Sequence, residues 1–258
     1  MKKYNAYLID LDGTIYRGSD TIDSGVRFVK RLQEKNIPYL FLTNNTTRTP
    51  EMVVAKLKGH GIETDVNHIY TPVLAAKTYL KEQNLTTTKI PVYLIGEQGL
   101  INGFLSDPRF YLDAQNPKYV IVGMDTDLTY KKVRTACRAI RNGATFIGTN
   151  ADKVLPAANE FLPGNGSQCK MIEEATGQKP IYIGKPASPI IEYALQLINK
   201  NKDEVVMVGD NYQTDIKAGM DNGLDTILTL TGVSNLEEVE KEEAQPTYIV
   251  KNMDDWKL

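Results

Sequence analysis

The chain has 258 residues, and its 30 lysine and arginine residues nearly balance its 32 aspartate and glutamate residues. Because the charges cancel and no basic run is present, the sequence lacks the electrostatic signature of a nucleic-acid-binding protein. No segment approaches the roughly 20 apolar residues that a membrane helix needs. The two cysteines, Cys137 and Cys169, are too few and too far apart for a disulfide framework. We therefore expect a cytoplasmic protein with neither a nucleic-acid nor a membrane partner.

The first third of the chain alternates short apolar runs with amphipathic segments, the pattern of a parallel sheet flanked by helices. Strands are predicted at residues 4–9, 37–42 and 68–71, and helices at residues 25–35, from Pro50 onwards, and at 72–83. Pro50 suits the first turn of a helix, where proline's missing N–H is harmless. The polar, threonine-rich stretch at residues 84–89 indicates a domain boundary.

The alternation of strands and helices begins again after this stretch. Strands are predicted at residues 91–95, 119–123 and 145–147, with a helix at residues 128–141. Residues 150–166 contain several prolines and glycines and are predicted to be irregular, and a helix at residues 167–176 ends at Gly177. We interpret residues 85–178 as an inserted module.

The last part of the chain returns to the first pattern. Strands are predicted at residues 181–183, 205–208, 226–230 and 248–250, and helices at residues 188–199 and 214–221. The predicted fold is therefore α/β. Residues 1–84 and 179–258 would form a doubly wound, Rossmann-like parallel-sheet core, and residues 85–178 would form a smaller α/β domain inserted into it.

Polar side chains follow four of the predicted strands, at the carboxyl ends where ligands bind in a doubly wound sheet. They are Asp10 and Asp12, Thr43 and Asn44, Lys185, and Asp210 with Asp215. Carboxylates gathered at one edge of a sheet repel one another, and partly buried charges need partners. A bound cation together with an anionic substrate would satisfy both requirements.

Asp10 and Asp12 lie two residues apart, so on an extended segment their side chains would point the same way. This spacing suits a division of labour in which Asp10 is a nucleophile that forms an aspartyl-phosphate and Asp12 is a general acid and base. Gly13 permits a turn that aims backbone amides at a phosphate. Magnesium suits such a site because it binds a few carboxylates and keeps several waters, and Lys185 and Thr43 would add charge stabilisation.

Each of these features also has a simpler interpretation. The Asp-x-Asp-Gly run resembles the start of a calcium loop, but that loop needs a glutamate at its twelfth position, which here is Thr21. Taken alone, Thr43 with Asn44 is typical of a turn, and Lys185 is typical of a solvated lysine. The joint occurrence of these residues, in order and each after a predicted strand, favours the phosphate-binding interpretation.

Four motifs in this order resemble those of the haloacid dehalogenase superfamily of phosphohydrolases. They are Asp10-Leu11-Asp12-Gly13-Thr14, Thr43-Asn44, Gly184-Lys185-Pro186, and Gly209-Asp210 followed by Asp215. The inserted module resembles that of the NagD-like sugar phosphatases, class IIA of the superfamily, through Val122-Gly123-Met124-Asp125, Thr149-Asn150-Ala151-Asp152 and Pro163-Gly164-Asn165-Gly166. The resemblance extends over nearly the whole chain.

The resemblance implies a role for each carboxylate of the core motifs. Asp10 would be the nucleophile and Asp12 the general acid and base. Mg²⁺ would be held by Asp10, by the backbone carbonyl of Asp12 and by Asp210. Asp215 would act through its contacts with these residues, and not on the substrate itself.

The resemblance also implies how the substrate is held. Thr43 and Lys185 would bind the phosphoryl group, with Asn44 in support. The inserted module would be a cap domain that closes over the substrate and excludes water. Its candidate substrate contacts are Asp125, Asn150 and Asp152.

The predicted function is magnesium-dependent hydrolysis of small phosphate monoesters, above all sugar phosphates and acid sugar phosphates. The expected partner is thus a small phosphorylated metabolite, and the cap could also join two copies into a homodimer. Three alternatives stay open: a nucleoside monophosphate phosphatase, a phosphotransferase or mutase, and a catalytically idle ligand-sensing or scaffold protein. The sequence does not choose the substrate, because specificity depends on cap side chains.

Overall fold

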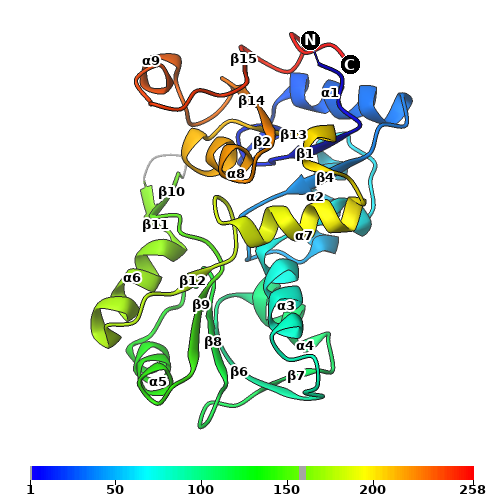
Figure 1. Cartoon of the computed structure of the whole chain (residues 1–258). Helices are drawn as coiled ribbons and strands as arrows, with labels where there is room; N and C mark the ends of the chain where they lie inside the picture. The colour runs from blue at the N-terminus through cyan, green and yellow to red at the C-terminus, as the bar shows by residue number, and fades with distance from the viewer. Residues whose placement is uncertain (1, 157–160) are drawn as a thin grey trace. The chain divides into compact units, whose positions relative to one another are not determined.

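The computed structural model describes residues 2–156 and 161–258, and internal contacts divide the chain into two units (Figure 1). The first unit comprises the residues up to Thr43, Pro50–Tyr70 and Lys185–Leu258. The second comprises Asn44–Thr49 and Thr71–Gly184. The second unit is thus larger than the predicted module of residues 85–178.

Helix α3 (Pro72–Glu82) lies in the second unit because its side chains bond to other parts of that unit. Lys77 Nζ donates to the carbonyl oxygen of Gly103 at 2.7 Å. Asn84, the first residue of the polar stretch, is buried, and its amide donates to Tyr119 Oη at 2.8 Å. This end of the stretch is therefore packed into the second unit instead of forming a linker.

The first unit contains a six-stranded sheet in which every pairing is parallel. Its strands, in spatial order, are β15 (Tyr248–Val250), β14 (Asp225–Thr229), β13 (Val205–Gly209), β1 (Ala6–Ile9), β4 (Tyr39–Leu42) and β5 (Ile69–Tyr70). The four residues of β1 are all buried, as expected for a strand covered on both faces. The predicted doubly wound α/β fold is confirmed.

Helices cover both faces of this sheet. They are α1 (Asp23–Glu34), α2 (Pro50–Gly59), α7 (Ser188–Ile198), α8 (Lys217–Asp221) and, near the chain end, α9 (Leu236–Val239). Tyr7 and Ile9 of β1 pack in one apolar cluster with Phe28 of α1 and Leu57 of α2. Helices α7 and α8 lie on the opposite face of the sheet in Figure 1. The alternation of side chains along β1 thus serves two helical layers.

The second unit has a parallel sheet of its own. Its strands, in spatial order, are β12 (Ile181–Tyr182), β9 (Thr145–Gly148), β8 (Tyr119–Val122), β6 (Ile90–Ile95) and β7 (Phe110–Leu112). Helices α5 (Tyr130–Arg141) and α6 (Asn165–Thr176) lie on one side, and α3 and α4 (Gln98–Leu105) on the other (Figure 1). A hairpin of β10 (Val154–Pro156) and β11 (Phe161–Pro163) precedes α6.

Several elements differ from the sequence-based expectation. Strand β12 was assigned to the core but pairs with β9 in the second unit, with Ile181 opposite Ile147. Helix α4 was not predicted because Gly99 and Gly103 weaken helix propensity. Packing requires Gly99, since a Cβ there would lie 2.5 Å from the carbonyl oxygen of Thr46. The short β7, the hairpin β10–β11 and the hairpin of β2 (Tyr16–Arg17) with β3 (Asp20–Thr21) were also missed.

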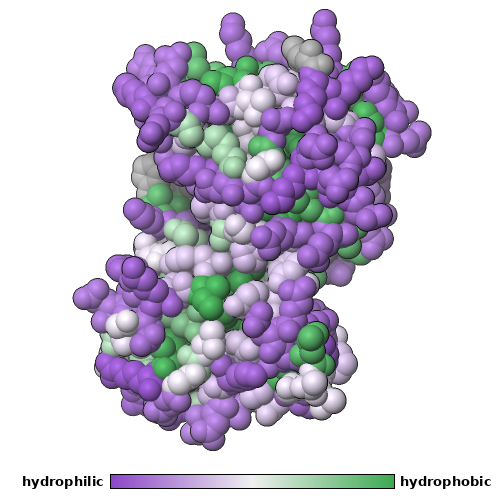
Figure 2. All heavy atoms as spheres, viewed as in Figure 1, coloured by the Kyte–Doolittle hydropathy of each residue, from purple (hydrophilic) through white to green (hydrophobic). Residues whose placement is uncertain are grey.

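The surface agrees with the composition. Figure 2 shows a visible face that is mainly hydrophilic, with apolar residues in small groups. In the part of the chain that the structure describes, no helix combines the length and the apolar character that crossing a membrane demands.

Candidate active site

Asp10 and Asp210 follow two neighbouring central strands, β1 and β13. In the sheet, β4 and β5 lie on one side of β1, whereas β13, β14 and β15 lie on its other side, so the strand order reverses direction next to β1. This is the switch point at which open α/β sheets bind ligands. Asp215, in the π-helical turn Tyr212–Ile216, joins the two: one carboxylate oxygen from each of the three residues lies within 4.8 Å of the others. We call these three residues the carboxylate cluster.

The ammonium group of Lys185 bonds directly to this cluster. Nζ donates to Asp10 Oδ1 at 2.6 Å and to Asp215 Oδ1 at 2.7 Å. It also donates to the carbonyl oxygen of Leu42, the last residue of β4, at 2.7 Å. The lysine is only 1% exposed. This residue is therefore not the solvated lysine of the simpler interpretation.

Burial and charge determine the protonation of the cluster. Burial, followed by the negative charge of Asp215, raises the pKa of Asp10 well above its usual range, although Lys185 opposes the rise. Burial alone would lower the pKa of Lys185, but the charges of Asp10 and Asp215 outweigh it and hold that pKa above its usual value. Burial and the charge of Asp215 raise the pKa of Asp210 to about 7.

The charges of the cluster do not cancel. Within the described residues, Asp10 and Asp215 both pair with the single ammonium group of Lys185, and no ion pair is formed by Asp210, so the three ionised carboxylates exceed the ammonium by two negative charges. Repulsion between buried carboxylates favours either a bound proton or a bound cation. A divalent cation would supply the missing charge.

Asp210 shows where such a cation would fit. Its Oδ2 accepts a hydrogen bond from the Val233 amide at 2.6 Å. Its Oδ1 is buried and has no partner in the described part of the chain, a costly state for a carboxylate oxygen. Gly13 approaches it closely: with φ at +97°, a Cβ there would lie 2.2 Å from Asp210 Oδ2. The turn after Asp12 therefore needs glycine for its conformation and for the space it leaves.

Asp12 and Thr43 lie in different environments. Asp12 is exposed, whereas Asp10 is 7% exposed, so the two carboxylates lie in different surroundings although they are two residues apart. The reason is that β1 ends at Ile9 and the chain turns at Gly13. Thr43 follows β4 directly and is buried, and its amide donates to the carbonyl oxygen of Tyr70 at 3.3 Å.

Three further predicted residues lie together within the second unit. Asn44 Nδ2 is 3.2 Å from each carboxylate oxygen of Asp152. Asn150 Nδ2 donates to the carbonyl oxygen of Asn44 at 2.9 Å, and its Oδ1 accepts from the Asp152 amide at 3.1 Å. Residues 44 and 150–152 are thus joined by a closed set of hydrogen bonds.

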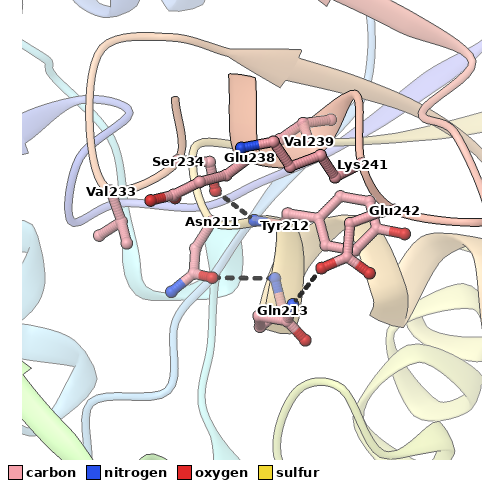
Figure 3. A pocket seen from close by; sticks show the side chains of 9 residues that line it. All are labelled: Asn211, Tyr212, Gln213, Val233, Ser234, Glu238, Val239, Lys241 and Glu242. Atoms are coloured by element: carbon pink, nitrogen blue, oxygen red, sulfur yellow. Dashed lines mark hydrogen bonds between the residues drawn. The ribbon is translucent and has the colours of Figure 1, made fainter. Parts of the chain in front are cut away.

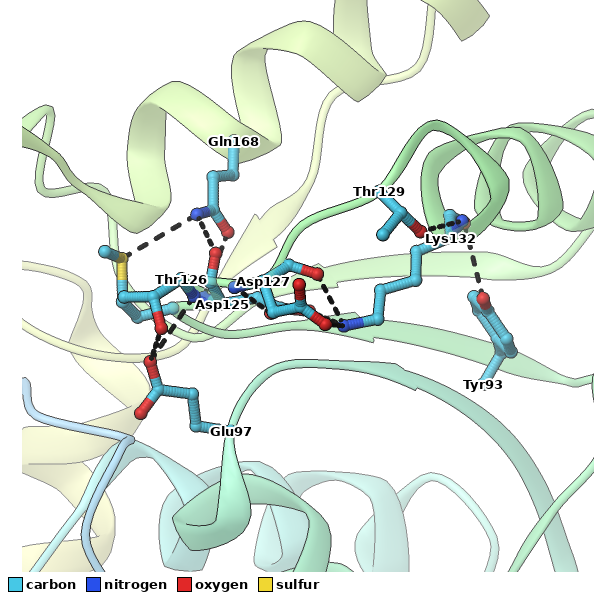
Figure 4. A network of polar contacts seen from close by, with 9 residues as sticks. Tyr93, Glu97, Asp125, Thr126, Asp127, Thr129, Lys132 and Gln168 are labelled. Carbon is cyan, nitrogen blue, oxygen red and sulfur yellow. Dashed lines mark hydrogen bonds and ion pairs between the residues drawn. The ribbon is translucent and has the colours of Figure 1, made fainter.

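Asp125 belongs to a separate network in the second unit (Figure 4). Its carboxylate accepts from Lys132 Nζ at 2.9 Å and from the Asp127 amide at 3.0 Å. Gln168 holds the backbone of the same residue, donating to its carbonyl oxygen at 2.8 Å and accepting from its amide at 3.2 Å. Asp125 is 3% exposed, so these contacts indicate that it shapes the loop after β8.

Two family models match this chain, one described as haloacid dehalogenase-like hydrolase over residues 7–105 and one as HAD-hydrolase-like over residues 182–256. An acid sugar phosphatase from Staphylococcus saprophyticus is 41% identical over 255 residues, which are 99% of this chain and 97% of that protein. The 5'-nucleotidase YutF of Bacillus subtilis is 40% identical over 256 residues, 99% of this chain and 98% of the relative. The chain belongs to the haloacid dehalogenase-like hydrolases.

Solved structures agree with this membership. A thermostable NPPase from Geobacillus stearothermophilus, a double mutant, has a TM-score of 0.92 and 45% identity, covering 100% of this chain and 99% of its own. A p-nitrophenyl phosphatase from Archaeoglobus fulgidus also has a TM-score of 0.92, at 29% identity, with 98% of both chains covered. As a member of this family, the protein is a phosphoric monoester hydrolase that acts on small phosphate monoesters.

One segment of the candidate site was not predicted from the sequence. Residues 231–234 follow β14, and Val233 bonds to Asp210. The signal was present, because Thr231 and Gly232 form a polar turn after a predicted strand, as the recognised motifs do. The signal was not recognised because the segment contains no carboxylate or lysine.

Proposed function

We propose that this protein is a magnesium-dependent phosphatase of small sugar phosphates, including acid sugar phosphates. The observation that carries the proposal is the carboxylate cluster with Lys185 at the switch point of the sheet. The names of several relatives at 41–42% identity, acid sugar phosphatases of Staphylococcus species, support the substrate class.

The donor set fits magnesium. Carboxylate oxygens are the ligands that this hard cation prefers, and the buried Oδ1 of Asp210 lacks a partner within the described residues. Asp10, Asp210 and the backbone carbonyl of Asp12 would hold the ion. When bound, Mg²⁺ would neutralise charge on the phosphoryl oxygens and on the cluster.

The chain's own residues would divide the reaction as follows. Asp10 attacks phosphorus and forms an aspartyl-phosphate, while Asp12 donates a proton to the leaving alkoxide. Asp12 then removes a proton from the water that hydrolyses this intermediate. Its exposure suits the exchange of protons with solvent. Lys185 and Thr43 bind phosphoryl oxygens, and Lys185 also orients Asp10 through the contact at 2.6 Å.

The second unit would be the substrate-selecting cap domain. Asn150 and Asp152, linked to Asn44, are the stronger candidates for substrate contacts, because the carboxylate of Asp125 is already held by Lys132 and by the loop itself. The support of Asn44 for the phosphoryl group, the cytoplasmic location and a homodimer through the cap stay predictions.

Two other activities differ from this proposal in their products. A nucleoside monophosphate phosphatase is suggested by the 40% identity with the 5'-nucleotidase YutF, and a mutase would pass the phosphoryl group to a second sugar. Membership of a hydrolase family argues against the catalytically idle alternative.

A phosphomonoester panel tests the proposal. Purified protein with Mg²⁺ should release inorganic phosphate from sugar phosphates faster than from nucleoside monophosphates, and a chelator should abolish release until excess Mg²⁺ restores it. Phosphate is measured together with the sugar product. Faster phosphate release from nucleoside monophosphates would contradict the proposed substrate class and favour a nucleotidase. An isomerised sugar phosphate without free phosphate would indicate a mutase. Full activity in the presence of chelator would refute the requirement for magnesium.

Magnesium should stabilise the protein more at about pH 8 than at about pH 5. The pKa of Asp210 is about 7 in the folded protein against a usual 3.8, so the folded state binds more protons than the unfolded chain between these values. The free energy of unfolding of the metal-free protein therefore falls as pH rises through this window. Mg²⁺ competes with the same proton, so its effect grows with pH.

Thermal unfolding with and without Mg²⁺ at both pH values measures this effect. Asp210→Asn is the control, because it removes one of the titrating groups and should reduce the difference between the two pH values. Equal stabilisation by Mg²⁺ at both pH values in the parent protein would contradict the prediction.

A further inference from the structure

The four residues that follow Leu230 are here called the 231–234 loop, and two of them, Val233 and Ser234, bond to the side chain and the backbone of Asp210. The Val233 amide donates to Oδ2 at 2.6 Å, and the Ser234 amide donates to the Asp210 carbonyl oxygen at 3.1 Å. The Ser234 hydroxyl accepts from the Tyr212 amide at 2.8 Å (Figure 3). The loop therefore fixes both the carboxylate and the turn that carries it.

Gly232 brings the backbone of the loop against the same carboxylate. A Cβ at this position would lie 1.8 Å from Asp210 Oδ2, a distance at which either the loop or the carboxylate must move. A residue with a side chain would thus displace an oxygen of the cluster.

Thr231 connects the loop to the first motif. Its Oγ1 donates to the carbonyl oxygen of Gly13 at 2.7 Å and lies 3.1 Å from Thr229 Oγ1. Its carbonyl oxygen accepts from Arg17 Nη2, in the hairpin β2–β3, at 2.5 Å. The turn that follows Asp12 and the carboxylate of Asp210 are therefore held by one short segment.

A carboxylate that rotates freely can offer either oxygen to a cation. Here Oδ2 is bonded to Val233 and confined by Gly232 and Gly13, so the buried Oδ1 is the oxygen left to a ligand in the described part of the chain. Residues that orient metal ligands in this way typically contribute 10–100-fold to metal affinity.

We propose that the 231–234 loop is a positioning element for the divalent cation: it presents Asp210 Oδ1 to Mg²⁺, and Thr231 keeps the Gly13 turn in register with it. This inference rests on the proposed magnesium-dependent phosphatase activity. The four loop residues act through Asp210 and Gly13, and none of them is a catalytic residue.

Calorimetric titration of the metal-free full chain with Mg²⁺ tests the proposal, alongside the apparent Mg²⁺ activation constant and the KM for the best sugar phosphate at saturating Mg²⁺. Thr231→Val should weaken Mg²⁺ binding by about tenfold and raise the activation constant similarly, with KM nearly unchanged. Thr231→Ser retains the hydroxyl and should behave as the parent.

A second pair of variants tests the role of the loop backbone. Gly232→Ala should weaken Mg²⁺ binding by about 10- to 100-fold. Its control is Gly59→Ala in the same unit, where an added Cβ meets nothing within 4 Å, and this variant should bind Mg²⁺ as the parent does. Thermal unfolding without metal verifies that each variant is folded.

The outcomes separate the two proposals. A parent protein that binds Mg²⁺ and needs it for activity, with Thr231→Val and folded Gly232→Ala unchanged in affinity, would overturn the positioning role alone. Equal losses in Thr231→Val and Thr231→Ser would also overturn it, because the hydroxyl would then be irrelevant. A parent that neither binds nor needs Mg²⁺ would overturn both proposals.

Discussion

Replacing Asp10 with asparagine is expected to lower kcat by about 10⁴-fold or more while the protein stays folded. The amide keeps the shape of the carboxylate but is not a nucleophile, so the proposed aspartyl-phosphate cannot form. The substitution also removes one negative charge from a buried cluster of three carboxylates, of which Asp10 and Asp215 share the ammonium group of Lys185 among the described residues. The metal-free variant should therefore be at least as stable as the metal-free parent.

Phosphate release under saturating Mg²⁺ and thermal unfolding in chelator measure the two effects. Asp225→Asn is the matched control: the same change is made in the same unit, at a carboxylate that pairs with Lys2 at 2.7 Å on the surface. This control should keep the parent's kcat. An Asp10→Asn protein as active as the parent would remove the proposed mechanism.

Replacing Lys185 with methionine should reduce both activity and stability. The ammonium group lies 2.6 Å from Asp10 and 2.7 Å from Asp215, and removing one partner of a buried ion pair costs about 3–5 kcal/mol because the other charge stays buried. In the proposed mechanism the same ammonium group binds the phosphoryl oxygens, so its loss should lower kcat/KM by about 10²-fold or more. Chemical denaturation and steady-state kinetics give the two values.

The pH dependence of this variant identifies the cause. Protonation of the remaining carboxylates relieves their repulsion, so the stability deficit of Lys185→Met should shrink from about pH 8 to about pH 5. Lys2→Met removes an exposed ion pair, which water and salt screen, and should leave the free energy of unfolding nearly unchanged at both pH values. A deficit in Lys185→Met that does not vary with pH would indicate a packing defect in place of the charge effect.

The strands that carry the candidate site could be predicted because their sequences are continuous apolar runs. The runs that form β1, β4 and β13 are buried along their whole length, so each is apolar without interruption and ends at a polar motif. Parallel strands align these ends at one edge of the sheet, which is why the sequence alone predicts that Asp10 and Asp210 lie together.

The unit boundaries could not be predicted in the same way. The amphipathic pattern of α3 indicates that one face of the helix is buried, but not which sheet that face packs on. The hydrogen bond from Lys77 to Gly103 places α3 in the second unit. Likewise, the family resemblance made Asp125 a candidate substrate contact, but its partner Gln168 lies 43 residues away and no local sequence pattern links the two. The 231–234 loop was missed because its contribution comes mostly from backbone groups.

The way the chain passes between the units sets a condition for exchanging the second unit between relatives. Residues 44–49 are a short excursion into the second unit, separated from its main part by a return to the first. Gly99 packs against the backbone of Thr46, and Asn44 bonds to Asp152, so the two pieces of the second unit fit each other closely. A functional chimaera therefore has to take residues 44–49 and 71–184 from the same parent, and a graft of one continuous segment would join mismatched halves.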